Sequence, residues 1–71
     1  MTPPASGPTG TSPGPALAVM ADHLERYHEE VGAMLPPYVA ADRGDVISAL
    51  VEAERALRTA ARLVRRAGRL T

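Results

Sequence analysis

The stretch from residue 45 to residue 70 constrains the fold most, because apolar and small side chains recur along it at helical spacing. Large and small residues alternate at intervals of four and three: Val46, Leu50, Ala53, Leu57, Ala60, Val64 and Ala67. This spacing is a heptad seam and predicts an α-helix over residues 45–69. Alanine at every seventh position lets a second helix approach closely, so we expect a helical neighbour.

A second heptad seam lies nearer the N-terminus. Its members recur at intervals of three and four: Leu17, Met20, Leu24, Tyr27, Val31 and Met34. They predict a helix over residues 16–35. Pro15 is compatible with the first turn of this helix, and Pro36 ends it by disfavouring helical conformation at Leu35.

Residues 36–44 form the predicted link between the two helices. Two prolines open it, and a glycine closes it. Pro37 is compatible with a single short helical turn. Gly44 suits a left-handed turn position, and Asp45 suits the N-cap of the second helix.

Residues 1–15 contain no charged residue and consist almost entirely of Pro, Gly, Ser, Thr and Ala, which predicts a disordered tail. Residues 16–71 are expected to form one domain of the all-α class, an antiparallel hairpin of two helices. Two helices alone would leave Val19, Ile47 and Leu63 outside the seams. We therefore expect two hairpins to associate as a four-helix bundle.

Pairing of the two seams predicts the core. With the link as the pivot, Leu24 falls beside Leu57 and Met20 falls beside Ala60. Large side chains then face small ones in several layers. The expected seam residues are Leu17, Met20, Leu24, Tyr27, Val31, Met34, Val46, Leu50, Leu57 and Val64.

Charge is balanced overall but unevenly placed. Eight basic residues, all arginine, oppose eight acidic ones, and the first predicted helix is net acidic while the second is net basic. Because the two predicted helices have net charges of opposite sign, pairing between them is favoured over binding of a polyanion. The lack of cysteine excludes disulfides and thiolate chemistry. No apolar run approaches the length of a membrane span, so we expect a cytoplasmic protein with no membrane association.

Arginines form a separate stripe along the second predicted helix. We expect pairing of acidic residues of the first helix with arginines of this stripe, which would favour one register more than it adds stability. The acidic residues are Glu29, Glu25 and Asp22, and the arginines within their reach are Arg55, Arg58 and Arg62. The last three arginines extend past the start of the first predicted helix and lack an evident acidic partner within the chain. With the arginine before them, they are the expected contacts for an acidic partner protein: Arg62, Arg65, Arg66 and Arg69.

We interpret the sequence as a non-catalytic helical interaction module, an adaptor, accessory subunit or regulator that binds itself and another protein. It has neither a glycine-rich phosphate loop nor a nucleophile motif, and we expect no cofactor. A nucleic-acid-binding regulator that uses the arginine stripe is the alternative. A third interpretation is a dinuclear metal protein. Glu25 and His28 have the E-x-x-H spacing found in four-helix carboxylate proteins, and Glu54 lies on a similar flank of the second helix.

Overall fold

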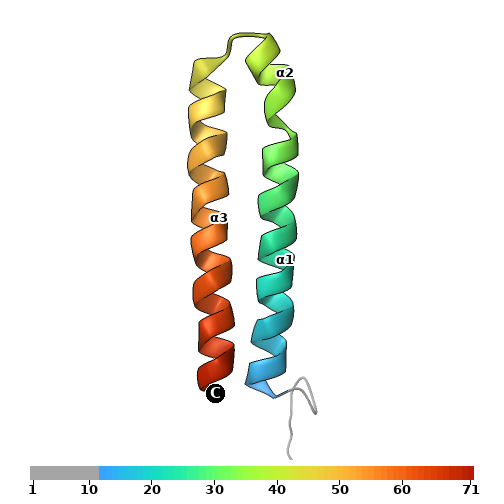
Figure 1. Cartoon of the computed structure of the whole chain (residues 1–71), viewed down its shortest axis with the longest axis vertical. Helices are drawn as coiled ribbons and strands as arrows, with labels where there is room; N and C mark the ends of the chain where they lie inside the picture. The colour runs from blue at the N-terminus through green and yellow to red at the C-terminus, as the bar shows by residue number, and fades with distance from the viewer. Residues whose placement is uncertain (1–11) are drawn as a thin grey trace, which may run out of the picture.

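The computed structural model describes residues 12–71, and most of this part of the chain is helical (Figure 1). Helix α1 comprises Pro13–Ala33, the short helix α2 comprises Leu35–Ala40, and the long helix α3 comprises Gly44–Leu70. Residues 12–71 contain no β-strand, so the predicted all-helical class is confirmed. The first eleven residues of the predicted tail lie outside the described part of the chain.

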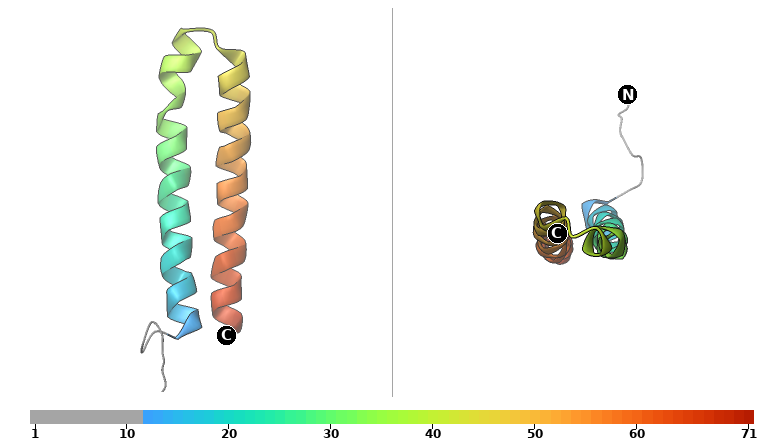
Figure 2. Two further views of the ribbon diagram at one scale, coloured as in Figure 1. Left: turned by 180° about the vertical axis from the view of Figure 1, so that it is seen from behind. Right: turned by 90° about the horizontal axis from the view of Figure 1, so that it is seen from above.

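Helices α1 and α3 lie side by side and run in opposite directions, connected at one end through α2 (Figure 1). Viewed from above, α1 and α3 lie next to each other (Figure 2). The 27 residues of α3 correspond to a length of about 40 Å. Within residues 12–71, no helix combines the length and the apolar character that crossing a bilayer requires.

Helix α1 begins at Pro13, earlier than the sequence predicts. Ser12 precedes it in extended conformation (φ −76°, ψ 153°), and the N–H of Ala16 donates to the carbonyl oxygen of Ser12 at 3.2 Å. Proline is tolerated in a first turn because its missing N–H would have no acceptor within the helix. Residues 13–15, which were expected in the tail, therefore form the first turn of α1.

The connection between the long helices is more helical than expected. A break at Met34 separates α1 from α2, which carries prolines in its first turn. The left-handed residue is Asp42 (φ 54°), and aspartate tolerates this conformation better than most residues. Gly44 is the first residue of α3, and Asp45 lies in its first turn with Arg43 at the N-cap. Because the tight turn falls before Gly44, the expectations for Gly44 and Asp45 are wrong.

Small residues of α1 and α3 lie close together across the helix contact. A Cβ atom placed on Gly68 would lie 3.1 Å from the carbonyl oxygen of Gly14. Ala21 (0% exposed) and Ala61 (2%) are the only fully buried residues within residues 12–71. In each helix the glycine and the alanine are seven residues apart, which is one heptad. The register therefore places Gly14 beside Gly68 and Ala21 beside Ala61.

This register divides the predicted seam into two rows. The partly buried row comprises Leu17, Leu24, Val31, Val46, Leu50, Leu57 and Val64. The exposed row comprises Met20 (54% exposed), Tyr27 (51%) and Met34 (58%). Met20, which the sequence predicts in the core, is half exposed, whereas its neighbour Ala21 is completely buried. Small residues bring the helices close together, and the bulkiest side chains remain at the edge of the contact.

Candidate functional site

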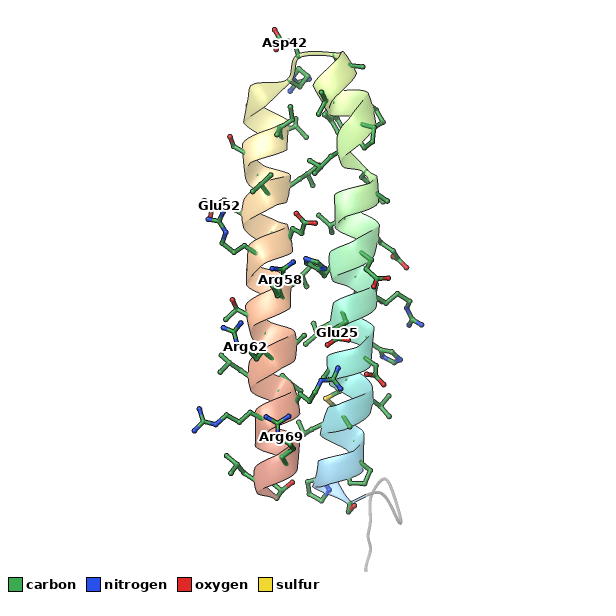
Figure 3. The ribbon with its side chains drawn as sticks, viewed as in Figure 1. Glu25, Asp42, Glu52, Arg58, Arg62 and Arg69 are labelled. Carbon is green, nitrogen blue, oxygen red and sulfur yellow. The ribbon has the colours of Figure 1, made fainter. Side chains whose placement is uncertain are left out.

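A groove runs between α1 and α3 on one side of the molecule, with a volume of about 400 Å³. Helix α1 contributes Glu25, His28 and Glu29, and α3 contributes Arg58, Arg62, Arg65 and Arg69. Figure 3 shows Glu25, Arg58, Arg62 and Arg69 on the face turned toward the viewer. The four arginines recur at intervals of four, three and four residues, so α3 presents them all on one side. We call this feature the arginine groove.

Arg65 connects the two walls of the arginine groove. Its Nη2 atom lies 3.1 Å from Oδ1 of Asp22 and 2.8 Å from Oε2 of Glu25. The hydrogen bond to Asp22, followed by that to Glu25, raises the pKa of Arg65 above its usual value. The expectation that Arg65 lacks an acidic partner within the chain is therefore wrong. Helical side chains lean toward the N-terminus of their helix, so Arg65 reaches back along α3 to these two carboxylates.

The other groove arginines are differently placed. Within residues 12–71, neither Arg58 nor Arg62 nor Arg69 has a carboxylate oxygen within 4.0 Å. Three of the four predicted partner-binding residues, Arg62, Arg65 and Arg69, line the groove, while Arg66 is exposed outside it. The structure thus brings together most of the residues for which an acidic partner is predicted.

A polar pair lies between the helices next to the arginine groove. Nε2 of His28 is 3.7 Å from Oε2 of Glu54, and the two side chains are partly buried. Gly32 provides room for the Glu54 carboxylate, since a Cβ atom at residue 32 would lie 2.6 Å from Oε2. His28 and Glu54 therefore form one polar layer in an interface whose closest contacts are between glycines and alanines.

The three candidate metal ligands are not brought together as the sequence suggests. His28 lies beside Glu54, but Glu25 is engaged by Arg65. Within residues 12–71, no cluster of three or more His, Cys, Asp or Glu side chains has a geometry that could hold a metal ion.

The opposite side of the molecule is apolar. The exposed row of α1 lies across the line of helix contact from Asp22 and Glu25, which face the arginine groove. On α3, the side turned away from the groove carries one valine and three alanines, all partly buried, at seven-residue intervals. We call the two rows together the apolar face: Met20, Tyr27 and Met34 of α1 with Val46, Ala53, Ala60 and Ala67 of α3.

Sequence reasoning missed the polar layer and the pairing of small residues. The signal was present: Gly14, Ala21 and His28 are spaced by seven, as are Glu54, Ala61 and Gly68. In an antiparallel pair, these two series match residue for residue. A pattern defined by large apolar side chains instead selects the neighbouring row of each helix.

The fold and the groove define a class of protein, namely an all-helical chain with one apolar face and one charged face. Comparison of the chain with protein-family models, with curated proteins and with solved structures found no match. Its function is therefore inferred from the geometry of the two faces.

Proposed function

We propose that this chain is a non-catalytic helical interaction module. Two helical hairpins associate through their apolar faces as a four-helix bundle, and the module binds a further protein. One observation carries the proposal: Met20, Tyr27 and Met34 are each about half exposed in a single row, while the only fully buried residues among those described are two alanines.

The energetics of the apolar face support association. Full burial of a large apolar side chain stabilises by about 1.5 to 3 kcal/mol relative to exposure. Each hairpin leaves Met20, Tyr27 and Met34 half exposed, and Leu63 is 54% exposed on the adjacent side of α3. Other means of stabilisation are few, because the chain lacks cysteine and the core formed by residues 12–71 is small.

The apolar face is self-complementary, which favours a second copy as its occupant. Bulky side chains lie on the α1 side and alanines lie on the α3 side. A shallow hollow of about 420 Å³ borders this face at Ala60, and its lining is partly charged: Glu52, Arg55, Ala56, Thr59, Ala60 and Leu63. In a two-fold dimer, Met20 and Tyr27 of one copy can insert above the alanines of the other, and the reverse contact forms by symmetry.

Light scattering on the full chain tests the proposal with a matched pair of variants. Met20 and Val19 are neighbours with nearly equal exposure, 54% and 53%, but only Met20 lies on the apolar face. We expect twice the chain mass at micromolar concentration for the wild type and for Val19→Glu, and a single chain mass for Met20→Glu. A wild-type chain that remains monomeric at high micromolar concentration would overturn the proposal, as would equal effects of the two variants.

Nucleic-acid binding is the alternative function, and the four arginines on one side of α3 are the observation in its favour. Glu25 and Glu29 line the same groove, and they repel phosphate groups. Titration with duplex DNA at two salt concentrations separates the functions. Salt-sensitive binding that Arg62→Gln weakens would support the alternative, and absence of binding would eliminate it.

A further inference from the structure

We infer that the arginine groove binds an amphipathic α-helix that carries acidic residues along one edge. This inference rests on the proposed function and names the chemistry of the protein partner. The groove and the apolar face lie on opposite sides of the pair of helices, so a partner helix and a second copy of the chain occupy different surfaces.

The charge of the groove calls for a ligand with an acidic edge. Four arginines of α3 face two glutamates of α1 in the lining. Arg65 is already engaged by Asp22 and Glu25, whereas the other three arginines have no carboxylate oxygen within 4.0 Å in residues 12–71. Carboxylates of a partner can therefore bind the α3 wall without displacing an existing ion pair.

The spacing of the arginines matches a helix better than an extended peptide. Arg58, Arg62, Arg65 and Arg69 are separated by four, three and four residues, which correspond to rises of about 6, about 4.5 and about 6 Å along α3. A neighbouring helix with glutamates at the same intervals presents its carboxylates in step with them. In an extended chain, residues on the same side recur about every 6.6 Å, so their spacing does not match that of the arginines.

The α1 wall of the groove distinguishes a helix from a nucleic acid. Glu29 lines this wall, and within residues 12–71 no basic nitrogen lies within 4.0 Å of its carboxylate. A phosphate backbone carries negative charge throughout and meets repulsion there. An amphipathic helix can turn its acidic edge toward α3 and a neutral or basic edge toward Glu29.

The shape and the apolar lining of the groove also fit a helix. Arginine side chains have long apolar stems that can pack against a partner while their guanidinium groups pair with carboxylates. The valley between α1 and α3 is a natural position for a third helix, because side chains of a third rod pack between those of the first two. Arg58 to Arg69 span eleven residues, or about 16 Å of that valley.

The test uses the full chain and a fluorescent, alanine-rich helical peptide with glutamates at intervals of four, three and four residues. A peptide of the same composition, shuffled so that its glutamates do not share a face, is the peptide control. Fluorescence anisotropy measures binding at two salt concentrations. The groove variant is Arg62→Gln with Arg69→Gln, and the matched control is Arg55→Gln with Arg66→Gln. All four arginines are exposed, and both variants lose the same charge, but only the first pair lines the groove.

We expect saturable binding of the helical peptide, weakened at least about threefold by the groove variant and much less by the control variant. Equal weakening by the two variants would overturn the inference, because it would indicate general charge attraction. Equal affinity for the shuffled peptide, or tighter binding of duplex DNA than of the helical peptide, would overturn it as well. Circular dichroism verifies that both variants remain helical. Light scattering on the same samples reports dimerisation separately, so a failure of the groove is distinguishable from a failure of the apolar face.

Discussion

Glu54 of α3 lies across the helix contact from His28 of α1, with Oε2 at 3.7 Å from Nε2. This pair continues the series in which Gly14 lies beside Gly68 and Ala21 beside Ala61. A slip of one heptad would place Glu54 beside Ala21 or Leu35, neither of which offers a polar side chain. The observed register therefore gives Glu54 a polar neighbour in α1, which the nearest alternatives do not.

Gly32→Ala tests how tightly this polar layer is packed. The new Cβ atom would meet Oε2 of Glu54 at 2.6 Å, but that atom is the end of a flexible, 30% exposed side chain. The carboxylate can move outward, while alanine favours the helix by about 0.5 to 1 kcal/mol. We expect a small net increase in the free energy of unfolding, measured by urea denaturation with circular dichroism. Gly44→Ala, which meets no atom within 4 Å, is the control. A loss above about 1 kcal/mol at residue 32 alone would show that the carboxylate is fixed.

Ala61→Leu tests the close contact between the helices. Ala61 is 2% exposed and lies beside Ala21, which is completely buried. A leucine there forces the helices apart, and overpacking of this kind destabilises by about 1 to 3 kcal/mol. We expect that loss in urea denaturation. Ala33→Leu adds the same atoms at an exposed position of α1 outside both the groove and the hollow, and we expect it to change the stability by less than about 0.5 kcal/mol. Equal losses in the two variants would contradict the close contact.

The helices themselves were predictable, because helical periodicity, alanine content and proline positions are local properties of the sequence. The row of α1 residues that faces α3 was not predictable in the same way. Met20 and Ala21 are adjacent, and either can lie at the edge of the same broad apolar side. The choice depends on how closely the two helices approach, and Gly14 and Gly68 allow a close approach. A pattern defined by large apolar side chains omits these small residues, although they belong to series with seven-residue spacing.

The sequence predicts that acidic residues of α1 pair with arginines of α3, but it does not identify the arginine. Opposed charges on the two helices indicate pairing, and Asp22 and Glu25 do pair with an arginine of α3. That arginine is Arg65 and not Arg58, because the direction in which a long side chain leans adds more than one turn to its reach. A register estimated from Cα positions alone omits this reach.

Arg65→Met tests whether this bridge stabilises the pair of helices. Methionine keeps most of the apolar stem but removes the hydrogen bonds to Asp22 and Glu25. The two carboxylates then lie near each other without a cation between them. We expect a lower midpoint of thermal unfolding than for Arg66→Met, which removes the same charge from an exposed position outside the groove. Identical midpoints for the two variants would show that the bridge contributes nothing measurable.

Asp45→Asn gives a prediction about pH. The guanidinium of Arg43 donates to the Asp45 carboxylate at 3.0 and 2.9 Å, and this contact, followed by the N–H of Val46, holds the pKa of Asp45 below its usual value. A carboxyl group with a lowered pKa in the folded state stabilises that state above its unfolded pKa of about 3.9, and the effect is lost as the pH falls through the folded pKa. We therefore expect Asp45→Asn to unfold at a lower temperature than the wild type at pH 7.

The difference between Asp45→Asn and the wild type should shrink as the pH is lowered below about 4 and vanish once the carboxyl group of the wild type is protonated. Asp42→Asn is the matched control, because it removes a charge from the same connection and asparagine accepts the left-handed conformation of residue 42 (φ 54°). Thermal scans by circular dichroism from pH 7 to pH 2 measure both variants. If the deficit of Asp45→Asn persists undiminished at pH 2, it arises from the geometry of the first turn of α3 and not from the ionised carboxylate.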